Sequence, residues 1–274
     1  MTAVADQRRV PHTARDLHIT AVGGPTAVLE FAGLRIVTDP TFDAPRDYPI
    51  TPERVLTKTE PSAFGADRVG TVDAVLLSHD HHVDNLDESG RAFIADVPVV
   101  FSTGAAAGRI GGVVRELPLW EHAELVRPDG GVLRVTRVPA LHGPEGTEHL
   151  VGEVAGFVLS GEGLPTVYVS GDNASLDLVR EIADRFERID IALLFAGAAK
   201  TPLIPEGHLT LTSAQTAEAA EILGAAHVVP LHFNSWAHFT EGIDDLRDAF
   251  AAAGLTDRVT LLAPGEATTV RVAE

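Results

Sequence analysis

The chain has 274 residues, 45% of them apolar, and carries 39 acidic against 21 basic side chains for a formal net charge of -18. This length and composition allow a large buried core, and the negative charge makes nucleic acids and anionic membranes unfavourable partners because no concentrated basic patch is present. There is no cysteine. A disulfide framework and a thiolate metal site are therefore excluded, and any metal must be held by imidazole and carboxylate groups.

Residues 1–15 are polar and without periodicity, which predicts a flexible N-terminal leader before a single domain over residues 16–274. The N-terminus lacks the apolar core of a signal peptide, and no stretch approaches the ~20 apolar residues of a membrane span. We therefore expect a soluble cytoplasmic protein. A homo-oligomer is compatible with the sequence, which does not define one.

The first elements are short β-branched runs at residues 17–22, 26–31 and 34–37, separated by glycine-containing turns. This pattern predicts three consecutive antiparallel strands. Between Pro40 and Gly70 four prolines interrupt the pattern, so we expect a long irregular loop that forms a wall of the active site.

A strand at residues 72–77 follows, and strand-like and helix-like segments then alternate. The predicted strands lie at residues 97–101, 166–169, 189–195, 226–231, 259–262 and 268–272. The predicted helices lie at residues 103–110, 174–186, 213–223 and 243–253, with Thr212 or Ser213 as a cap and Gly224 as a stop for the third. This alternation is typical of an α/β chain with mixed sheets.

The most informative segment follows the strand at residues 72–77 and reads Ser-His-Asp-His-His-Val-Asp-Asn-Leu-Asp, from Ser78 to Asp87. Three imidazoles and three carboxylates in this space repel one another or lose hydration unless a cation neutralises them. The cluster therefore predicts a metal site. Asp87 is expected to be a surface or supporting carboxylate instead of a ligand.

Further candidate ligands stand just past the ends of other predicted strands. They are His142, Asp172 and His232, and His208 lies in a glycine-containing loop after another strand. Residues at several strand ends can converge on one rim of a sheet, so these side chains are expected to meet the histidine cluster.

Four motifs in this order resemble the metallo-β-lactamase fold superfamily of metal-dependent hydrolases, in particular its lactonase-like intracellular branch. They are Gly-Gly-Pro-Thr-Ala-Val-Leu-Glu with Thr38-Asp39-Pro40, Ser78-His79-Asp80-His81, Gly171-Asp172-Asn173 and Pro230-Leu231-His232. The resemblance covers residues 17–272. It implies a four-layer αββα sandwich, with two mixed β-sheets flanked by helices.

The resemblance also implies one or two divalent metal ions, with Zn²⁺ expected and Mn²⁺ or Fe²⁺ as alternatives. The first would be held by His79, by His81 or His82, and by His142, and the second by Asp84, bridging Asp172 and His232. The metal loop has one residue too many between its first histidines and Asp84, so the sequence does not choose between His81 and His82. Asn85 replaces the final histidine of the family pattern, which predicts a weaker second site.

A divalent cation lowers the pKa of its bound water to ~7 and so supplies hydroxide for attack on an ester, lactone or phosphoester. Asp84 is the candidate to orient this water, and His208 and His238 are candidates to bind a small-molecule substrate or to protonate the leaving group. Arg46, Arg54 and Arg109 are the loop arginines that could meet a phosphorylated substrate. The alternatives are a non-enzymatic metal-binding or sensor protein, which Asn85 favours, and a nuclease, which the net charge disfavours.

Overall fold

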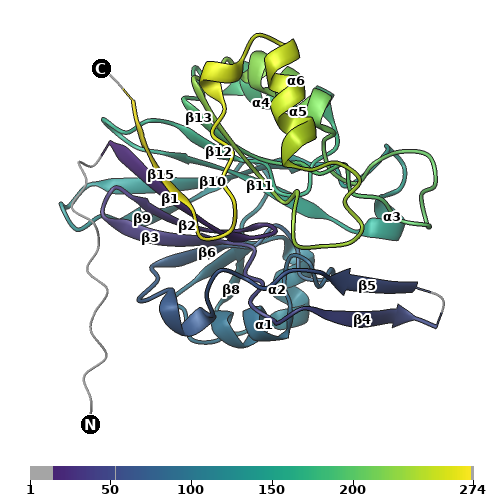
Figure 1. The fold of residues 1–274 in the computed structure, drawn as a ribbon. Coiled ribbons are helices and arrows are strands. Elements are labelled where there is room, and N and C mark those ends of the chain that lie inside the picture. Colours follow the sequence, from purple (N-terminus) through teal and green to yellow (C-terminus); the bar gives the residue numbers. More distant parts are fainter. Residues whose placement is uncertain (1–14, 53, 273–274) are drawn as a thin grey trace.

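Two mixed β-sheets lie face to face at the centre of the protein, in a computed structural model that describes residues 15–52 and 54–272 (Figure 1). The predicted leader lies outside these residues except for residue 15. The first sheet has seven strands. In spatial order they are β15 (Ala267–Arg271), β1 (Asp16–Gly23), β2 (Thr26–Phe31), β3 (Leu34–Thr38), β6 (Ala74–Leu76), β7 (Val100–Ser102) and β8 (Val114–Glu116).

The second sheet has six strands. In spatial order they are β14 (His227–Leu231), β13 (Ile191–Phe195), β12 (Val167–Val169), β11 (Val154–Ser160), β10 (Val132–Ala140) and β9 (His122–Val126). In each sheet, part of the strands run parallel: β3 with β6, β7 and β8 in the first, and β12 with β13 and β14 in the second. The carboxyl ends of these parallel strands share one edge in each sheet, which is where loops can carry ligands.

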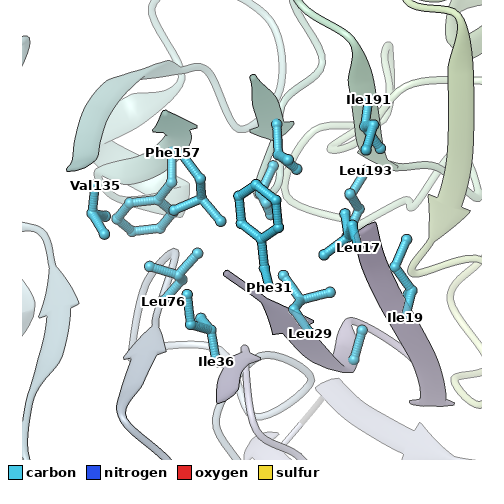
Figure 2. Packing of buried hydrophobic residues seen from close by; sticks show 14 of the residues in the cluster. Leu17, Ile19, Leu29, Phe31, Ile36, Leu76, Val135, Phe157, Ile191 and Leu193 are labelled. Carbon is cyan, nitrogen blue, oxygen red and sulfur yellow. The ribbon is translucent and has the colours of Figure 1, made fainter. Parts of the chain in front are cut away.

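The main core fills the space between the sheets, as Figure 2 shows. Alternate residues of β1, β2 and β3 face inward, which places Leu17, Leu29 and Ile36 against Phe157 and Leu193 of the second sheet. The predicted meander of three antiparallel strands is confirmed by this arrangement.

Helices cover the outer faces of both sheets (Figure 1). On the first sheet lie α1 (Glu88–Ile94) and α2 (Gly104–Ile110), and on the second lie α4 (Leu176–Arg185), α5 (Ser213–Leu223) and α6 (Ile243–Ala252). Thr212 caps α5 and Gly224 ends it in the left-handed conformation, as predicted. A short helix α3 (Glu148–Val151) and two 3-10 turns (Ala66–Arg68 and Thr256–Arg258) complete the elements. The predicted αββα layering is confirmed; the single domain over residues 16–274 stays a prediction.

The prediction of a long irregular loop between Pro40 and Gly70 is wrong in part. This segment contains a hairpin of β4 (Arg46–Thr51) and β5 (Arg54–Lys58), which projects beside the sheets (Figure 1). Pro49 is tolerated because its strand β4 pairs only with β5 and has a free outer edge, and the register shifts between Pro49 and Thr51. The prolines therefore mark an edge hairpin, and do not exclude strands.

The predicted strand at residues 259–262 does not form. Val259 makes only an isolated bridge to Val228, with the Thr260 amide donating to the Val228 carbonyl at 2.9 Å. The chain then turns at Pro264 and Gly265 into β15, so it leaves the edge of the second sheet after a single contact. Within residues 15–52 and 54–272, none of the helices has the length and apolar character that a bilayer crossing requires.

Candidate metal centre

The predicted ligands lie at the carboxyl ends of strands from both sheets and converge there. In chain order they are His79, His81, His82 and Asp84 after β6, His142 after β10, Asp172 after β12 and His232 after β14. The chain thus brings together, at one edge of the sandwich, side chains that are up to 153 residues apart in sequence (232 − 79). These side chains converge at strand ends as expected, whereas His208, which was expected to join them, belongs to none of the candidate ligand groups among the described residues.

Three histidines form the tightest group. The His82 Nδ1 atom lies 3.0 Å from His79 Nε2 and 3.1 Å from His142 Nε2. Nitrogen ligands at 2.0–2.1 Å from a tetrahedral zinc ion are separated by about 3.3 Å, so this spacing suits a single cation. His79 and His142 are buried and His82 is partly buried.

Neighbouring groups fix the rings of His79 and His142. The His142 Nδ1 atom lies 2.9 Å from the Leu209 carbonyl, which can only accept, so Nδ1 carries the hydrogen and Nε2 presents a lone pair in the neutral ring. The Ser78 hydroxyl donates to Asp39 at 2.6 Å and lies 2.9 Å from His79 Nδ1, so this nitrogen donates to Ser78 and leaves Nε2 free. Such contacts orient metal-ligating histidines.

His81 lies beside this group, with a ring nitrogen within 4.8 Å of the ligand atoms of His79 and His82. Its Nε2 atom hydrogen-bonds the Val151 carbonyl at the end of α3, and the ring is exposed to solvent. Gly152 leaves space for the ring, since a Cβ there would lie 2.4 Å from His81. Although the His81 ring is close to His79 and His82, the arrangement favours the alignment in which His82 is the second histidine of the loop.

A second group of Asp84, Asp172 and His232 adjoins the first. The His232 Nε2 atom lies 3.3 Å from Asp172 Oδ1 and 3.4 Å from Asp84 Oδ2, but neither contact has hydrogen-bond geometry, and both ring nitrogens of this fully buried side chain are without a partner. Asp172 also belongs to a group with His79 and His142. Its position between the two groups suits the predicted bridging role.

The backbone of His232 has a φ of +59°, which is unusual for a residue with a side chain. The amide of His232 donates to the Gly24 carbonyl at 2.8 Å and so ties this conformation to the first turn of the chain. The strained residue directs a buried imidazole at two carboxylates, which is the arrangement expected at a functional site.

Asn85 points its amide group at carboxylates. The Asn85 Nδ2 atom donates to Asp172 at 3.1 Å and to Asp39 at 3.2 Å, while its Oδ1 atom is buried without a partner. Asn85 therefore holds the carboxylates of Asp39 and Asp172 in place. Its described contacts are made by the amide nitrogen, which cannot bind a cation. Burial raises the pKa of Asp39 to about 7, against the hydrogen bonds from Ser78 that favour the carboxylate.

The two groups differ in their affinity for protons. Burial lowers the pKa of all three clustered histidines, that of His82 to about 3, and their mutual proximity adds to the effect. Burial also disfavours the charged form of His232, but Asp172 and Asp84 outweigh it and raise its pKa to about 10. At neutral pH the three histidines are thus ready to bind a cation, whereas His232 carries a proton.

We expect metal binding at the second group to release a proton. Above pH 6.5 the three clustered histidines are neutral, so the first equivalent displaces no proton from them, while a cation beside Asp84 and Asp172 must displace the proton of His232 below pH 10. The apparent affinity of the second equivalent should therefore rise about tenfold per pH unit between pH 6.5 and 9. Calorimetric titrations of metal-free protein in buffers of different ionisation enthalpy measure this proton; equal heats in all buffers for both equivalents would contradict the assignment.

Of the three predicted catalytic residues, two lie at the centre. The His238 Nε2 atom is 3.1 Å from Asp84 Oδ2, and His232 and His238 together hold the pKa of Asp84 low despite its burial. His208 is partly exposed and does not line the cleft described below. Substrate binding or proton donation by His208 therefore stays a prediction.

One expectation about an individual carboxylate needs correction. Asp87 is not a surface residue: it is fully buried, caps α1 through the Gly90 amide and pairs with Lys58 at 3.2 Å. It nevertheless supports the loop, as the alternative expectation had it.

Sequence reasoning missed the groups that orient the ligands. Asp39 and Ser78 fix His79, and the carbonyls of Leu209 and Val151 fix His142 and His81. Asp39 follows β3 as the predicted ligands follow their strands, which is a signal for it; backbone carbonyls leave no signal in the side-chain sequence.

The donor set of four imidazoles and two carboxylates fits a divalent cation such as zinc. Comparisons with known proteins agree with this chemistry. A family model described as the beta-lactamase superfamily domain matches residues 34–233. A metal-dependent hydrolase of Methanosphaerula palustris is 28% identical over 197 residues, which is 70% of this chain and 81% of that protein. A metal-dependent hydrolase of Pyrococcus furiosus is 28% identical over 134 residues, and the match spans 49% of this chain and only 54% of that protein.

Solved structures share the fold. An isothiocyanate hydrolase from Delia radicum gut bacteria superposes with a TM-score of 0.77 at 23% identity, covering 92% of this chain and 98% of that one. A possible metal-dependent hydrolase from Veillonella parvula also gives 0.77, at 18% identity, covering 92% and 99%. These likenesses concern the fold. Together with the family match over residues 34–233, they show that the chain belongs to the beta-lactamase superfamily and has the metallo-β-lactamase fold.

Proposed function

We propose that the protein is a metal-dependent hydrolase that cleaves a small ester, lactone or phosphoester. The observation that carries the proposal is that the Nε2 atoms of His79 and His142 lie 3.0 and 3.1 Å from His82 Nδ1, beside the group of Asp84, Asp172 and His232. The names of the relatives from Methanosphaerula palustris and Pyrococcus furiosus support the same activity.

Zinc is the cation we propose for the three-histidine group, and a second cation would be held by Asp84, Asp172 and His232. A divalent cation bound there lowers the pKa of its water ligand to ~7 and so supplies hydroxide at neutral pH. The weaker second site predicted from Asn85 remains part of the proposal, since Asn85 donates to Asp172.

The protein supplies orientation and proton transfer. Asp84 lies at the floor of the cleft with His238 against its Oδ2 atom, so the pair is placed to hold a water molecule and to return a proton to the leaving oxygen after the scissile bond breaks. Ser78 and Leu209 hold His79 and His142 through their Nδ1 atoms, which keeps the Nε2 atoms directed at His82 Nδ1, where the three rings would hold a cation.

Removal and return of the metal tests this function. Zinc-loaded protein should hydrolyse at least one member of a panel of lactones, aryl esters and phosphodiesters, and dialysis against a chelator should abolish the turnover reversibly. Circular dichroism of the metal-free protein controls for unfolding. Stoichiometric metal with no turnover on the whole panel would instead support the sensor alternative, and binding of RNA or DNA would support the nuclease alternative.

A further inference from the structure

The cleft above the metal centre has an apolar wall and a small volume. Its volume is about 200 Å³, below the ~300 to 1,000 Å³ typical of sites for drug-sized ligands. The floor consists of His81, His82, Asp84, His142 and His238. The apolar lining comes from four separate segments: Ile50, Val55 and Leu56 of the β4–β5 hairpin, Val83 of the loop after β6, Val151 of α3, and Pro202 and Leu209 of the loop after β13.

Large apolar side chains are also exposed around the mouth of the cleft. Ile50 and Val55 line it and are 39% and 52% exposed, and Leu150 and Leu203 are exposed directly beside the lining residues Val151 and Pro202. Of the six exposed large apolar side chains among the described residues, two therefore line the cleft and two are adjacent in sequence to a residue that lines it. Such a concentration marks a binding surface and favours a ligand with an apolar body.

Two cations stand among these apolar residues. Arg54 of the hairpin and Lys200 of the loop after β13 both line the cleft, and neither makes an ion pair in the part of the chain that the structure describes. The other candidate arginines are occupied: Arg46 pairs with Glu88, and Arg109 pairs with Asp80 through its Nε atom at 3.0 Å. Neither Arg46 nor Arg109 lines the cleft.

The carboxylate of Asp84, the one acidic group of the lining, is already engaged by His238 and His232. In a chain with a net charge of -18, two cations at the mouth of a cleft without a carboxylate partner create a local positive field. Lys200 is also tied to the centre, because its amide donates to the His238 carbonyl at 3.1 Å.

We propose, on the basis of the hydrolase function above, that the substrate is a compact ester or lactone with an apolar body and one anionic group, which Arg54 and Lys200 bind. The apolar body lies against the hairpin and Leu209, and the anionic group lies between the two cations at the mouth. The reacting carbonyl then faces the metal centre at the floor.

Equilibrium binding tests the proposal without turnover. N-butylsuccinamic acid carries one carboxylate and an amide in place of the ester, and N-butylsuccinamide, its primary amide, is the neutral match without an ester bond. By calorimetry, metal-loaded protein should bind the acid roughly tenfold more tightly than this neutral amide at low ionic strength, and less so at high salt. The double variant Arg54→Gln with Lys200→Gln should lose this preference, while Arg54→Lys with Lys200→Arg should keep most of it.

Arg46→Gln is the matched control, because it removes an arginine from the same hairpin outside the cleft and should leave the preference unchanged. Equal binding of the acid and the neutral amide by the wild type overturns the proposal. Retention of the preference in the double glutamine variant also overturns it, since the carboxylate would then be bound by the metal centre. Either result leaves hydrolysis of neutral esters standing, whereas the absence of turnover on every ester would overturn the hydrolase function itself.

Discussion

Replacing His82 by alanine should remove at least one equivalent of bound metal and lower turnover at least about 100-fold, whereas His81→Ala should retain the metal of the wild type. The reason is geometric. His82 Nδ1 is the atom on which His79 Nε2 and His142 Nε2 converge, at 3.0 and 3.1 Å. Without it, the only groups left for this cation are the imidazoles of His79 and His142 and the carboxylate of Asp172, which the second group shares.

His81 is the matched control because it is adjacent in sequence, has the same side chain and lines the same cleft. Its Nε2 atom is hydrogen-bonded to the Val151 carbonyl, so its loss leaves the three convergent nitrogens in place. Metal content per chain by elemental mass spectrometry, with turnover on the same samples, measures the difference. Loss of metal in His81→Ala and not in His82→Ala would reverse the alignment of the loop.

The second large effect concerns stability: Lys58→Met should lower the free energy of unfolding by about 3 to 5 kcal/mol. Lys58 and Asp87 form an ion pair with a distance of 3.2 Å, and their side chains are 1% and 0% exposed. Burial lowers the pKa of Lys58, and the carboxylates of Asp87 and Asp43 limit this shift. Removal of the amine leaves the Asp87 carboxylate buried without its charge partner, which is the costly state.

This pair anchors the hairpin that walls the cleft. Lys58 is the last residue of β5, and its amine also donates to Ser62 at 3.2 Å, while Asp87 caps α1 and accepts from the Asp43 amide. Urea unfolding of metal-free protein measures the loss. The double variant Lys58→Met with Asp87→Asn should be more stable than the sum of the two single losses implies, because it leaves no unpaired charge. A loss below about 1 kcal/mol in Lys58→Met would contradict this account.

Several features of the fold follow from local sequence. The alternation of apolar residues in β1 to β3, the cap Thr212 and the stop Gly224 each depend on near neighbours, and the structure confirms them. The hairpin between Pro40 and Gly70 was not predicted because proline usually interrupts a strand, although edge strands tolerate it. The strand predicted at residues 259–262 does not form because strand pairing depends on tertiary contacts, and this segment makes only one bridge to the second sheet.

The sequence by itself determined the donor set of this protein. Imidazoles and carboxylates follow the strands and no thiolate is present, so the candidate metals are divalent cations that bind nitrogen and oxygen ligands. Only the tertiary structure favours His82 over His81, buries Asp87 against Lys58, and brings Arg54 and Lys200 from distant segments to one cleft. The physical reason is that ligand identity is a property of residue types, whereas ring orientation, burial and convergence depend on contacts between residues far apart in the chain. The extra residue in the loop leaves two neighbouring imidazoles as candidates for one ligand position. The carbonyl that binds His81 belongs to Val151 of α3, 70 residues further along the chain.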